Sequence, residues 1–403
     1  MMSLFIAALS LALWGYLLTS RGGFWRAQQR DDAGTGAPDL IEWPRVVAVI
    51  PARDEAELIG ETLTSLLRQD YGGAFSIVVV DDHSSDATTR LATAAAAACE
   101  ASDRLTVLAA PSLPPGWTGK LWSLDHGIRY VDSMRGPPDY LLLTDADIRH
   151  SPDVLTELVR RARRNGLVLT SLMAKLRCES VVERALIPAF VFFFQMLYPF
   201  AWVNSPRRKT AAAAGGCMLV HRATLGHAGG VAAVRNEIID DCALARLLKR
   251  QGPIGICLSE RVHSIRNYRS FEAVRRMIVR SAFAQLRYSQ WLLAFAVVAM
   301  MIVFVVPVAV ALFADGTPRI LGMVAWALMV VAFQPTLRFY RASPFWGIAL
   351  AAIAACYTAL TVDSAIQHAR GSGGEWKGRT QAIAPTAALQ PRKKRQARNA
   401  NAH

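Results

Sequence analysis

Long apolar runs without a charged residue lie at both ends of the chain and constrain its fold most strongly. There are four such runs, at residues 3–19, 291–314, 320–337 and 345–362. About 20 apolar residues are enough for a helix to cross a bilayer. A mean hydropathy of +0.24 with only 19% charged residues also excludes a disordered or collagen-like protein. We therefore expect an N-terminal transmembrane anchor at 1–20, a linker at 21–44 and C-terminal transmembrane helices at 291–363.

Basic residues indicate which side of the membrane holds the rest of the chain. No basic residue precedes the first run and no small-residue cleavage pattern follows it, which argues against a signal peptide. Arg21, Arg26 and Arg30 follow the run and favour the cytoplasmic side. The six cysteines form no C-x-x-C pair, so we expect reduced thiols. These features predict a multi-pass protein of a bacterial-type inner (plasma) membrane, with the central domain in the cytoplasm.

The number of C-terminal spans and the charge of the C-terminal tail predict opposite sides of the membrane for the end of the chain. Three spans after a cytoplasmic domain would leave the C-terminus outside. The chain from Arg370 onward nevertheless carries eight basic residues and one acid, which favours the inside. Either one of the three segments is re-entrant or the tail is exported. We expect 364–403 to be a disordered basic tail suited to anionic lipids, and not to nucleic acid, because no aromatic residues are interleaved with it.

A fifth apolar stretch lies inside the chain, at 185–203. It contains prolines, a glutamine and three adjacent phenylalanines, Phe192 to Phe194. A full span here would separate the motifs described below onto opposite sides of the membrane. We therefore favour an aromatic-rich helix lying in the membrane interface, with a buried core helix as the alternative.

Between residues 45 and 290 the pattern changes to short β-branched runs that alternate with amphipathic stretches. The runs predict buried strands at 46–51, 76–80, 105–108, 140–143 and 167–171. The stretches between them predict helices at 55–69, 86–98, 120–131 and 152–164. This alternation predicts an α/β domain with a mostly parallel sheet, in which ligands bind at the carboxyl ends of the strands.

Acidic clusters lie where such a sheet would bind its ligands. They are Asp81, Asp82 and Asp86 after one strand, Asp145 and Asp147 after another, and Asp240 and Asp241 at the start of a helix. Each cluster alone has a structural explanation as a turn, a helix cap or a partner of the helix dipole. Two carboxylates at positions i and i+2, however, repel each other unless a cation lies between them. Their hard oxygen ligands suit Mg²⁺ or Mn²⁺ held together with substrate phosphates.

The order of the motifs is more specific than any one of them. IPARDE at 50–55, VDDHSSD at 80–86, TDAD at 144–147 and IDDCALARLL at 239–248 closely resemble the inverting glycosyltransferases of family 2. The resemblance covers roughly residues 45–290 and implies a GT-A fold, which is Rossmann-like. PPGWTGK at 114–120, FVFFFQ at 190–195 and the C-terminal apolar runs are similar to a membrane-bound branch, the hopanoid-biosynthesis-associated glycosyltransferases.

The resemblance also implies which residues bind the donor. A nucleotide cradle would be formed by Pro51, Ala52, Arg53, Glu55, Asp81 and Asp82. Asp82 would accept a hydrogen bond from the base, and Asp145 would lie under the sugar and ribose. Asp147 would bind the Mg²⁺ or Mn²⁺ ion that bridges the diphosphate. Lys120 lies in a segment like the family's G-K motif.

Further residues are implied on the acceptor side. Asp241 aligns with the family's general base, and Asp240 replaces the usual preceding Glu. Gly215 and Gly216 open a segment like the family's glycine-rich acceptor loop. Many membrane members carry a (Gln/Arg)-x-x-Arg-Trp signature, from which residues 272–276 depart. Contact with the diphosphate and binding to the anionic membrane surface therefore stand as equal interpretations of Arg275, Arg276 and Arg280.

Together these features predict an inverting, metal-dependent glycosyltransferase. It would move a sugar from a nucleotide-diphosphate sugar, with a UDP-sugar as the expected donor, to a membrane lipid related to hopanoids at the cytoplasmic face. A processive polysaccharide synthase and an inactive scaffold of a lipid-biosynthesis complex are the alternatives. The scaffold is disfavoured because all four motif aspartates, Asp82, Asp145, Asp147 and Asp241, are present.

Overall fold

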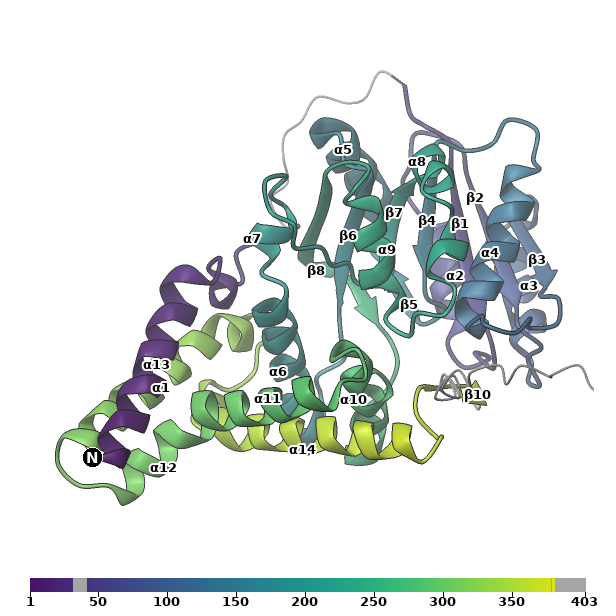
Figure 1. Ribbon diagram of the computed structural model, residues 1–403. Helices are drawn as coiled ribbons and strands as arrows, with labels where there is room; N and C mark the ends of the chain where they lie inside the picture. The colour runs from purple at the N-terminus through teal and green to yellow at the C-terminus, as the bar shows by residue number, and fades with distance from the viewer. Residues whose placement is uncertain (32–41, 378, 381–403) are drawn as a thin grey trace, which may run out of the picture.

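A computed structural model describes residues 1–31, 42–377 and 379–380 of the chain. Figure 1 shows an α/β body built around a sheet and a group of long apolar helices beside it. The N-terminal helix α1 (Met2–Ser20) packs with the C-terminal helices of this group, where the Trp14 indole donates to the carbonyl of Val303 at 2.7 Å. Part of the predicted linker and the end of the predicted tail, residues 32–41 and 381–403, lie outside the described residues.

One eight-stranded sheet forms the centre of the body, in the order β3-β2-β1-β4-β7-β6-β8-β5. The strands β7 and β5 run antiparallel to their neighbours and the remaining pairs are parallel. This confirms the predicted α/β fold with a mostly parallel sheet. The strands are β1 (Val46–Ala52), β2 (Phe75–Asp81), β3 (Leu105–Ala109), β4 (Tyr140–Thr144), β5 (Ile148–His150), β6 (Leu169–Lys175), β7 (Cys217–His221) and β8 (Ile254–Ser264).

Helices cover both faces of the sheet because successive side chains of a strand point to opposite faces. In β1, Val47 and Val49 enter one core while Val46, Ala48 and Ile50 enter the other. The second core is closed by α2 (Ile59–Leu67), α3 (Thr88–Ala98) and α5 (Val154–Asn165). The first core is closed by α4 (Gly119–Asp132), α8 (Arg222–His227) and α9 (Asp240–Leu248). Burial on both faces explains why the strands read as continuous apolar runs.

The fifth apolar stretch forms α6 (Val181–Leu197) and the short helix α7 (Phe200–Val203). Ser180 begins α6 with a capping box, in which its side chain accepts from the Glu183 amide. Ile187 packs into the core of the body, whereas Phe192 and Phe193 pack against the apolar helices, and Phe192 is 0% exposed. The burial of Phe192 agrees with the alternative of a buried core helix. The interpretation as a helix in the membrane interface does not hold for Phe192, which is covered by protein.

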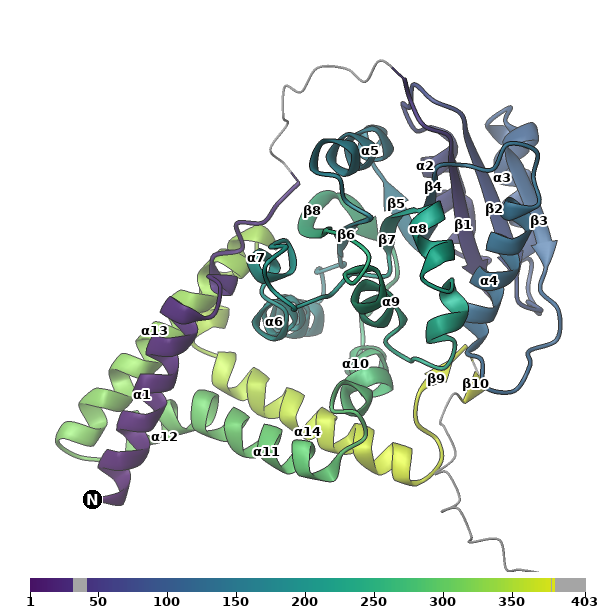
Figure 2. The same ribbon diagram turned by 45° about the horizontal axis from the view of Figure 1, so that its top comes forward.

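In the described part of the chain, four helices are long and apolar enough to cross a membrane: Met2–Ser20, Gln290–Phe313, Thr317–Phe339 and Leu350–Ala369. The second is bent, because a π-helical turn at Met301–Val305 and the following Pro307 separate α11 (Gln290–Met300) from α12 (Val306–Phe313). Helix α10 (Phe271–Gln285) connects the body to α11. In Figures 1 and 2, α1 lies beside α13 (Thr317–Phe339), while α11 lies beside α14 (Leu350–Ala369) at an angle to that pair.

Both ends of the segment that contains α14 contact the α/β body. Before it, Phe339 and Tyr340 belong to the core of the body. After it, the Lys377 side chain donates to the Asp54 carbonyl at 3.0 Å. The segment therefore leaves the body and returns to it.

Candidate active site

A lysine bridges two of the acidic clusters predicted from the sequence. Thr118 caps α4 and places Lys120 in its first turn, facing the carboxyl end of β4. The Lys120 ammonium lies 2.9 Å from a carboxylate oxygen of Asp145 and 3.1 Å from one of Asp240. Burial alone lowers the pKa of Lys120, but these two carboxylates outweigh it and raise the pKa above its usual value. The charged lysine therefore links the end of β4 to the start of α9.

Asp241 lies beside this bridge and accepts two backbone hydrogen bonds. Its two oxygens accept from the amides of Gly215 at 2.9 Å and Cys242 at 2.6 Å. A Cβ added at Gly215 would lie 3.2 Å from the Lys120 ammonium and 3.5 Å from Asp241. The absence of a side chain at 215 thus keeps open the space in front of the carboxylate.

The environment of Asp241 suits a base that works near neutral pH. Burial, followed by the neighbouring charge of Asp240, raises the pKa of Asp241 to about 6. A carboxylate must be deprotonated to accept a proton, so turnover should fall about tenfold per pH unit below pH 6. A profile of kcat/KM between pH 4.5 and 8.5 tests this. A flat profile down to pH 5 would contradict the assignment of Asp241 as the base.

Asp147 and Glu55 share an arginine that the sequence analysis missed. The Arg266 guanidinium donates to Asp147 at 2.7 Å and to both oxygens of Glu55 at 2.7 and 2.9 Å. Burial, the larger effect, raises the pKa of Glu55, and Arg266 partly offsets it. Arg266 follows β8, and the register of that strand brings it to the acids, since the Ile265 amide donates to the Asp147 carbonyl at 2.9 Å. The position of Arg266 just after a strand was the only indication in the sequence that it could belong to the site, and Arg266 is part of no recognised motif.

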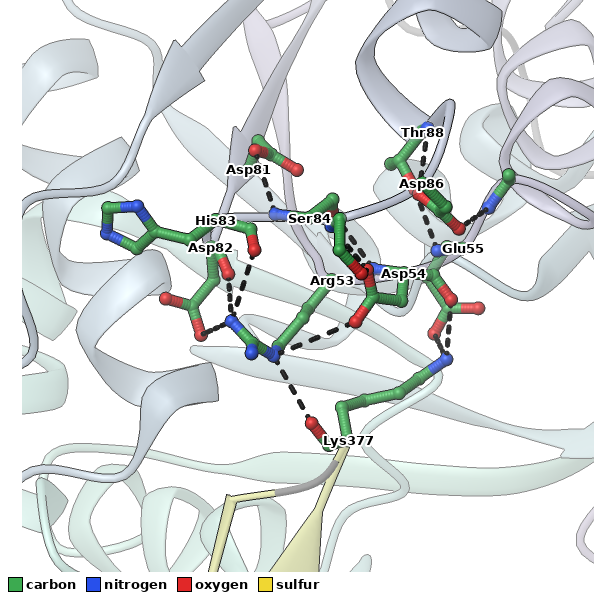
Figure 3. Close-up of polar contacts among 12 residues, drawn as sticks. Arg53, Asp54, Glu55, Asp81, Asp82, His83, Ser84, Asp86, Thr88 and Lys377 are labelled. Carbon is green, nitrogen blue, oxygen red and sulfur yellow. Dashed lines mark hydrogen bonds and ion pairs between the residues drawn. The ribbon is translucent and has the colours of Figure 1, made fainter.

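The residues predicted to form a nucleotide cradle lie where β1 and β2 end, and Figure 3 shows the polar contacts among them. Arg53 donates to the carbonyl of Asp82 at 2.5 Å and lies 4.0 Å from its carboxylate, and the Asp82 side chain is 0% exposed. Asp81 accepts from the Ser84 amide at 3.3 Å. Asp86 accepts from the amides of Ala56 and Thr88 at 3.0 and 2.9 Å. Asp86 thus stabilises the turn before α3, whose N-cap residue is Ala87.

Two cavities meet at these residues. A polar cavity of about 570 Å³ is lined by members of the first and third motifs, by Arg266 and by α10, including Pro51, Glu55, Asp145, Asp147, Arg276 and Arg280. A mainly apolar groove of about 360 Å³ lies between the body and helices α6, α10, α11 and α14, and Asp240, Asp241 and Gly215 line its inner end. Lys120, Asp145 and Arg280 line both. The bridge around Lys120 is therefore the boundary between a polar and an apolar site.

The remaining predicted residues differ in their placement. Arg275 is held by Asp363 of α14 at 2.7 Å and by Glu272 at 2.9 Å, which leaves Arg276 and Arg280 as the predicted arginines that line the polar cavity. Ala52 ends β1 and is buried. The carbonyl of Gly216 accepts from Thr144 at 2.7 Å, which fixes the glycine-rich segment beside the end of β4.

The acids have the chemistry of an open metal site. Asp145 and Asp147 lie at the end of one strand and line the polar cavity, so both offer hard oxygen ligands. Within the described part of the chain, no three His, Cys, Asp or Glu side chains form a closed metal cluster. The oxygen atoms of Asp145 and Asp147 are of the type that Mg²⁺ or Mn²⁺ prefers.

Comparison with known proteins shows what the α/β body is similar to. Residues 47–228 match the family model described as glycosyl transferase family 2. No curated protein matches the chain at a significant level. Among solved structures, the chain is similar to the mannosyltransferase PcManGT from Pyrobaculum calidifontis, solved with GDP-Man and Mn²⁺. The identity is 19%, the TM-score is 0.58, and the match covers 90% of this chain and 99% of that one.

A second solved structure is more distant. The chain is 20% identical to glucosyl-3-phosphoglycerate synthase from Mycobacterium tuberculosis, with a TM-score of 0.38 and coverage of 60% of this chain and 79% of that one. At 19% identity, the similarity to PcManGT shows a shared fold and not a shared activity. Together with the family match, it confirms a GT-A fold.

Proposed function

We propose that this chain, whose residues 47–228 form a glycosyltransferase family 2 domain, transfers a sugar from a nucleotide-diphosphate sugar to a hydroxyl group of a membrane lipid. The observation that carries the proposal is the meeting of the polar cavity and the apolar groove at Lys120 and Asp145. The polar side has the acids and cations that suit a sugar diphosphate. Two of the helices that line the apolar side, α11 and α14, belong to segments that are long and apolar enough for a membrane.

The donor belongs in the polar cavity. Its diphosphate would face the cationic groups of Arg266, Arg276 and Arg280 that line this cavity. PcManGT was solved with a nucleotide sugar and Mn²⁺, which supports the same two classes of ligand here. An Mg²⁺ or Mn²⁺ ion held by Asp147 and Asp145 would stabilise negative charge on the leaving phosphates. A UDP-sugar is the expected donor.

The acceptor belongs in the apolar groove. A lipid alcohol would place its apolar body among Phe193, Phe194 and Ile278 and its hydroxyl beside Asp241, all of which line this groove. An alcohol has a pKa far above 7 and needs a base as it attacks. Asp241 takes this proton while the acceptor oxygen forms its bond to C1 of the sugar and the bond from C1 to the phosphate breaks. Attack from the side opposite the leaving group inverts the configuration at C1.

The proposed membrane arrangement follows from the path of the chain. α1 and the hairpin of α12 and α13 insert into the bilayer, and α14 returns to the catalytic side, where its segment ends at Lys377. The basic tail then lies on the cytoplasmic side of a bacterial-type inner membrane, in agreement with the positive-inside rule. The lipid enters the groove laterally from the cytoplasmic leaflet, and a hopanoid-related alcohol is the expected acceptor.

A screen of labelled nucleotide sugars tests the proposal. The purified protein would be incubated with each donor, Mg²⁺ or Mn²⁺ and a native lipid extract, and labelled products in the organic phase would be identified by mass spectrometry. We expect one donor to label a lipid. Binding of nucleotides without any labelled lipid would contradict a lipid acceptor, and failure to bind any nucleotide would contradict the transferase function itself.

Filling the apolar groove should impair acceptor use alone. We expect Ala296→Trp, on the groove wall in α11, to lower kcat/KM for the lipid at least tenfold because the added ring occupies the space of the acceptor. The Kd of the donor should stay within about twofold. Ala294→Trp, two residues away on an exposed position of the same helix, is the matched control and should behave like wild type. Equal activity of both variants would place the acceptor elsewhere.

A further inference from the structure

The segment after α14 reaches back to the nucleotide cradle, as Figure 3 shows. The Lys377 ammonium lies 2.9 Å from a carboxylate oxygen of Glu55 and donates to the carbonyl of Asp54 at 3.0 Å. The carbonyl of Lys377 accepts from Nε of Arg53 at 3.2 Å. One residue near the end of the described chain thus contacts three successive residues of the first motif.

These contacts close the cradle at its base-binding end. The Arg53 guanidinium donates to the carbonyl of Lys377 on one side. On the other side it donates to the carbonyl of Asp82. Neither Arg53 nor Asp82 is among the described residues that line the polar cavity, whereas Glu55 and Lys377 are. The sugar and diphosphate end of the site is therefore open, while the carboxylate expected to read the base is covered.

The backbone of the segment is suited to opening. Lys377 has a φ of 49°, in the left-handed region that is unfavourable for a residue with a side chain, so its contacts hold it in place. Gly371 and Gly374 have φ values of 76° and 71°, which glycine adopts without strain. The two glycines give the chain between α14 and Lys377 a means to turn once these contacts are lost.

We propose that residues 372–377 form a strap that closes the nucleotide cradle in the donor-free enzyme and that the nucleotide displaces Lys377 in order to reach Asp82. The proposal rests on the proposed function and adds an autoinhibitory contact to it. The ligand that competes with the strap is a nucleoside diphosphate, because the strap covers the base-binding end of the cradle. Apparent donor affinity is then reduced by the fraction of molecules in which the strap is open.

Removing the Lys377 side chain tests the strap in the full-length protein. Loss of a cation beside an anionic ligand would by itself weaken binding, so tighter binding is diagnostic of a released strap. If the cradle is closed in about nine-tenths of molecules, Lys377→Ala should lower the Kd of UDP or GDP up to about tenfold. Lys209→Ala removes the same charge at an exposed position away from the site and should leave the Kd unchanged. An unchanged or higher Kd in Lys377→Ala would overturn the proposal.

Proteolysis gives an independent measurement on the wild type. With the strap closed, the Lys377 side chain is engaged and tryptic cleavage after it should be slow. Saturating UDP or GDP should accelerate this cleavage, mapped by mass spectrometry, whereas protection by the nucleotide would show that the strap closes over the donor and would overturn the proposal. If wild type and Lys377→Ala both fail to bind any nucleotide, the proposed function fails as well. If both bind equally well, only the strap is refuted.

Discussion

Asp241→Asn is expected to lower kcat for sugar transfer by about 10³- to 10⁴-fold, because the substitution removes the group that takes the proton of the acceptor. The amide has nearly the same size as the carboxylate, and its oxygen can still accept from the Gly215 or Cys242 amide. Donor binding should therefore stay within about twofold of wild type. Label transfer to lipid and the Kd of the nucleotide, measured on the same preparation, check both expectations.

Asp240→Asn is the matched control, since it removes the same charge one residue earlier. Asp240 pairs with Lys120 and is the second cause, after burial, of the raised pKa of Asp241. We expect this variant to lose much less turnover than Asp241→Asn and to move the acid limb of its pH profile to lower pH. Comparable turnover in Asp241→Asn and Asp240→Asn would contradict the assignment of Asp241 as the base.

Asp147→Ala is expected to lower transfer by about 10³-fold, equivalent to about 4 kcal/mol of transition-state stabilisation, because it removes the proposed metal ligand. It also leaves Arg266 with Glu55 as its remaining carboxylate partner in the site. The Kd of the nucleotide should rise at least tenfold when Mg²⁺ or Mn²⁺ is present. Titration of nucleotide with and without the metal provides the measurement.

The metal dependence of wild type supplies the control for this variant. If Asp147 holds the metal, an excess of chelator should weaken nucleotide binding in wild type and have little further effect in Asp147→Ala. Asp103→Asn, at the surface and away from both cavities, should respond to the chelator as wild type does. Full transfer activity of wild type in excess chelator would refute the metal requirement.

Sequence motifs identified candidate site residues only where these residues follow from local structure. Asp82, Asp145 and Asp241 lie at strand ends or at a helix start, and the order of their motifs indicated one site. Arg266 and Lys377 were missed because they reach the site through tertiary structure, from the end of β8 and from the segment after α14. A charged residue in such a position has no local pattern that distinguishes it from a solvated one.

For the fold as well, features with a local sequence pattern were predicted and those without one were missed. Buried runs such as VVAVIP at 46–51 predicted the parallel strands, whereas β7 and β8 were missed because CMLVH and IGICLSERVHS include polar and small residues among few β-branched ones. The apolar composition of α6 predicted that the helix is buried away from water. It did not specify whether lipid or protein buries it. The structure covers Phe192 with Phe24 and Phe333, from segments far away in the sequence.

The stereochemistry of the product tests the central claim most directly. Wild-type protein in lipid vesicles would receive the donor identified by the screen, and the anomeric configuration of the glycolipid would be determined by NMR. Single displacement with Asp241 as the base predicts a lipid glycoside whose configuration is opposite to that of the donor. A glycoside with the donor's own configuration, or release of free sugar in place of a glycolipid, would contradict direct transfer to a lipid hydroxyl.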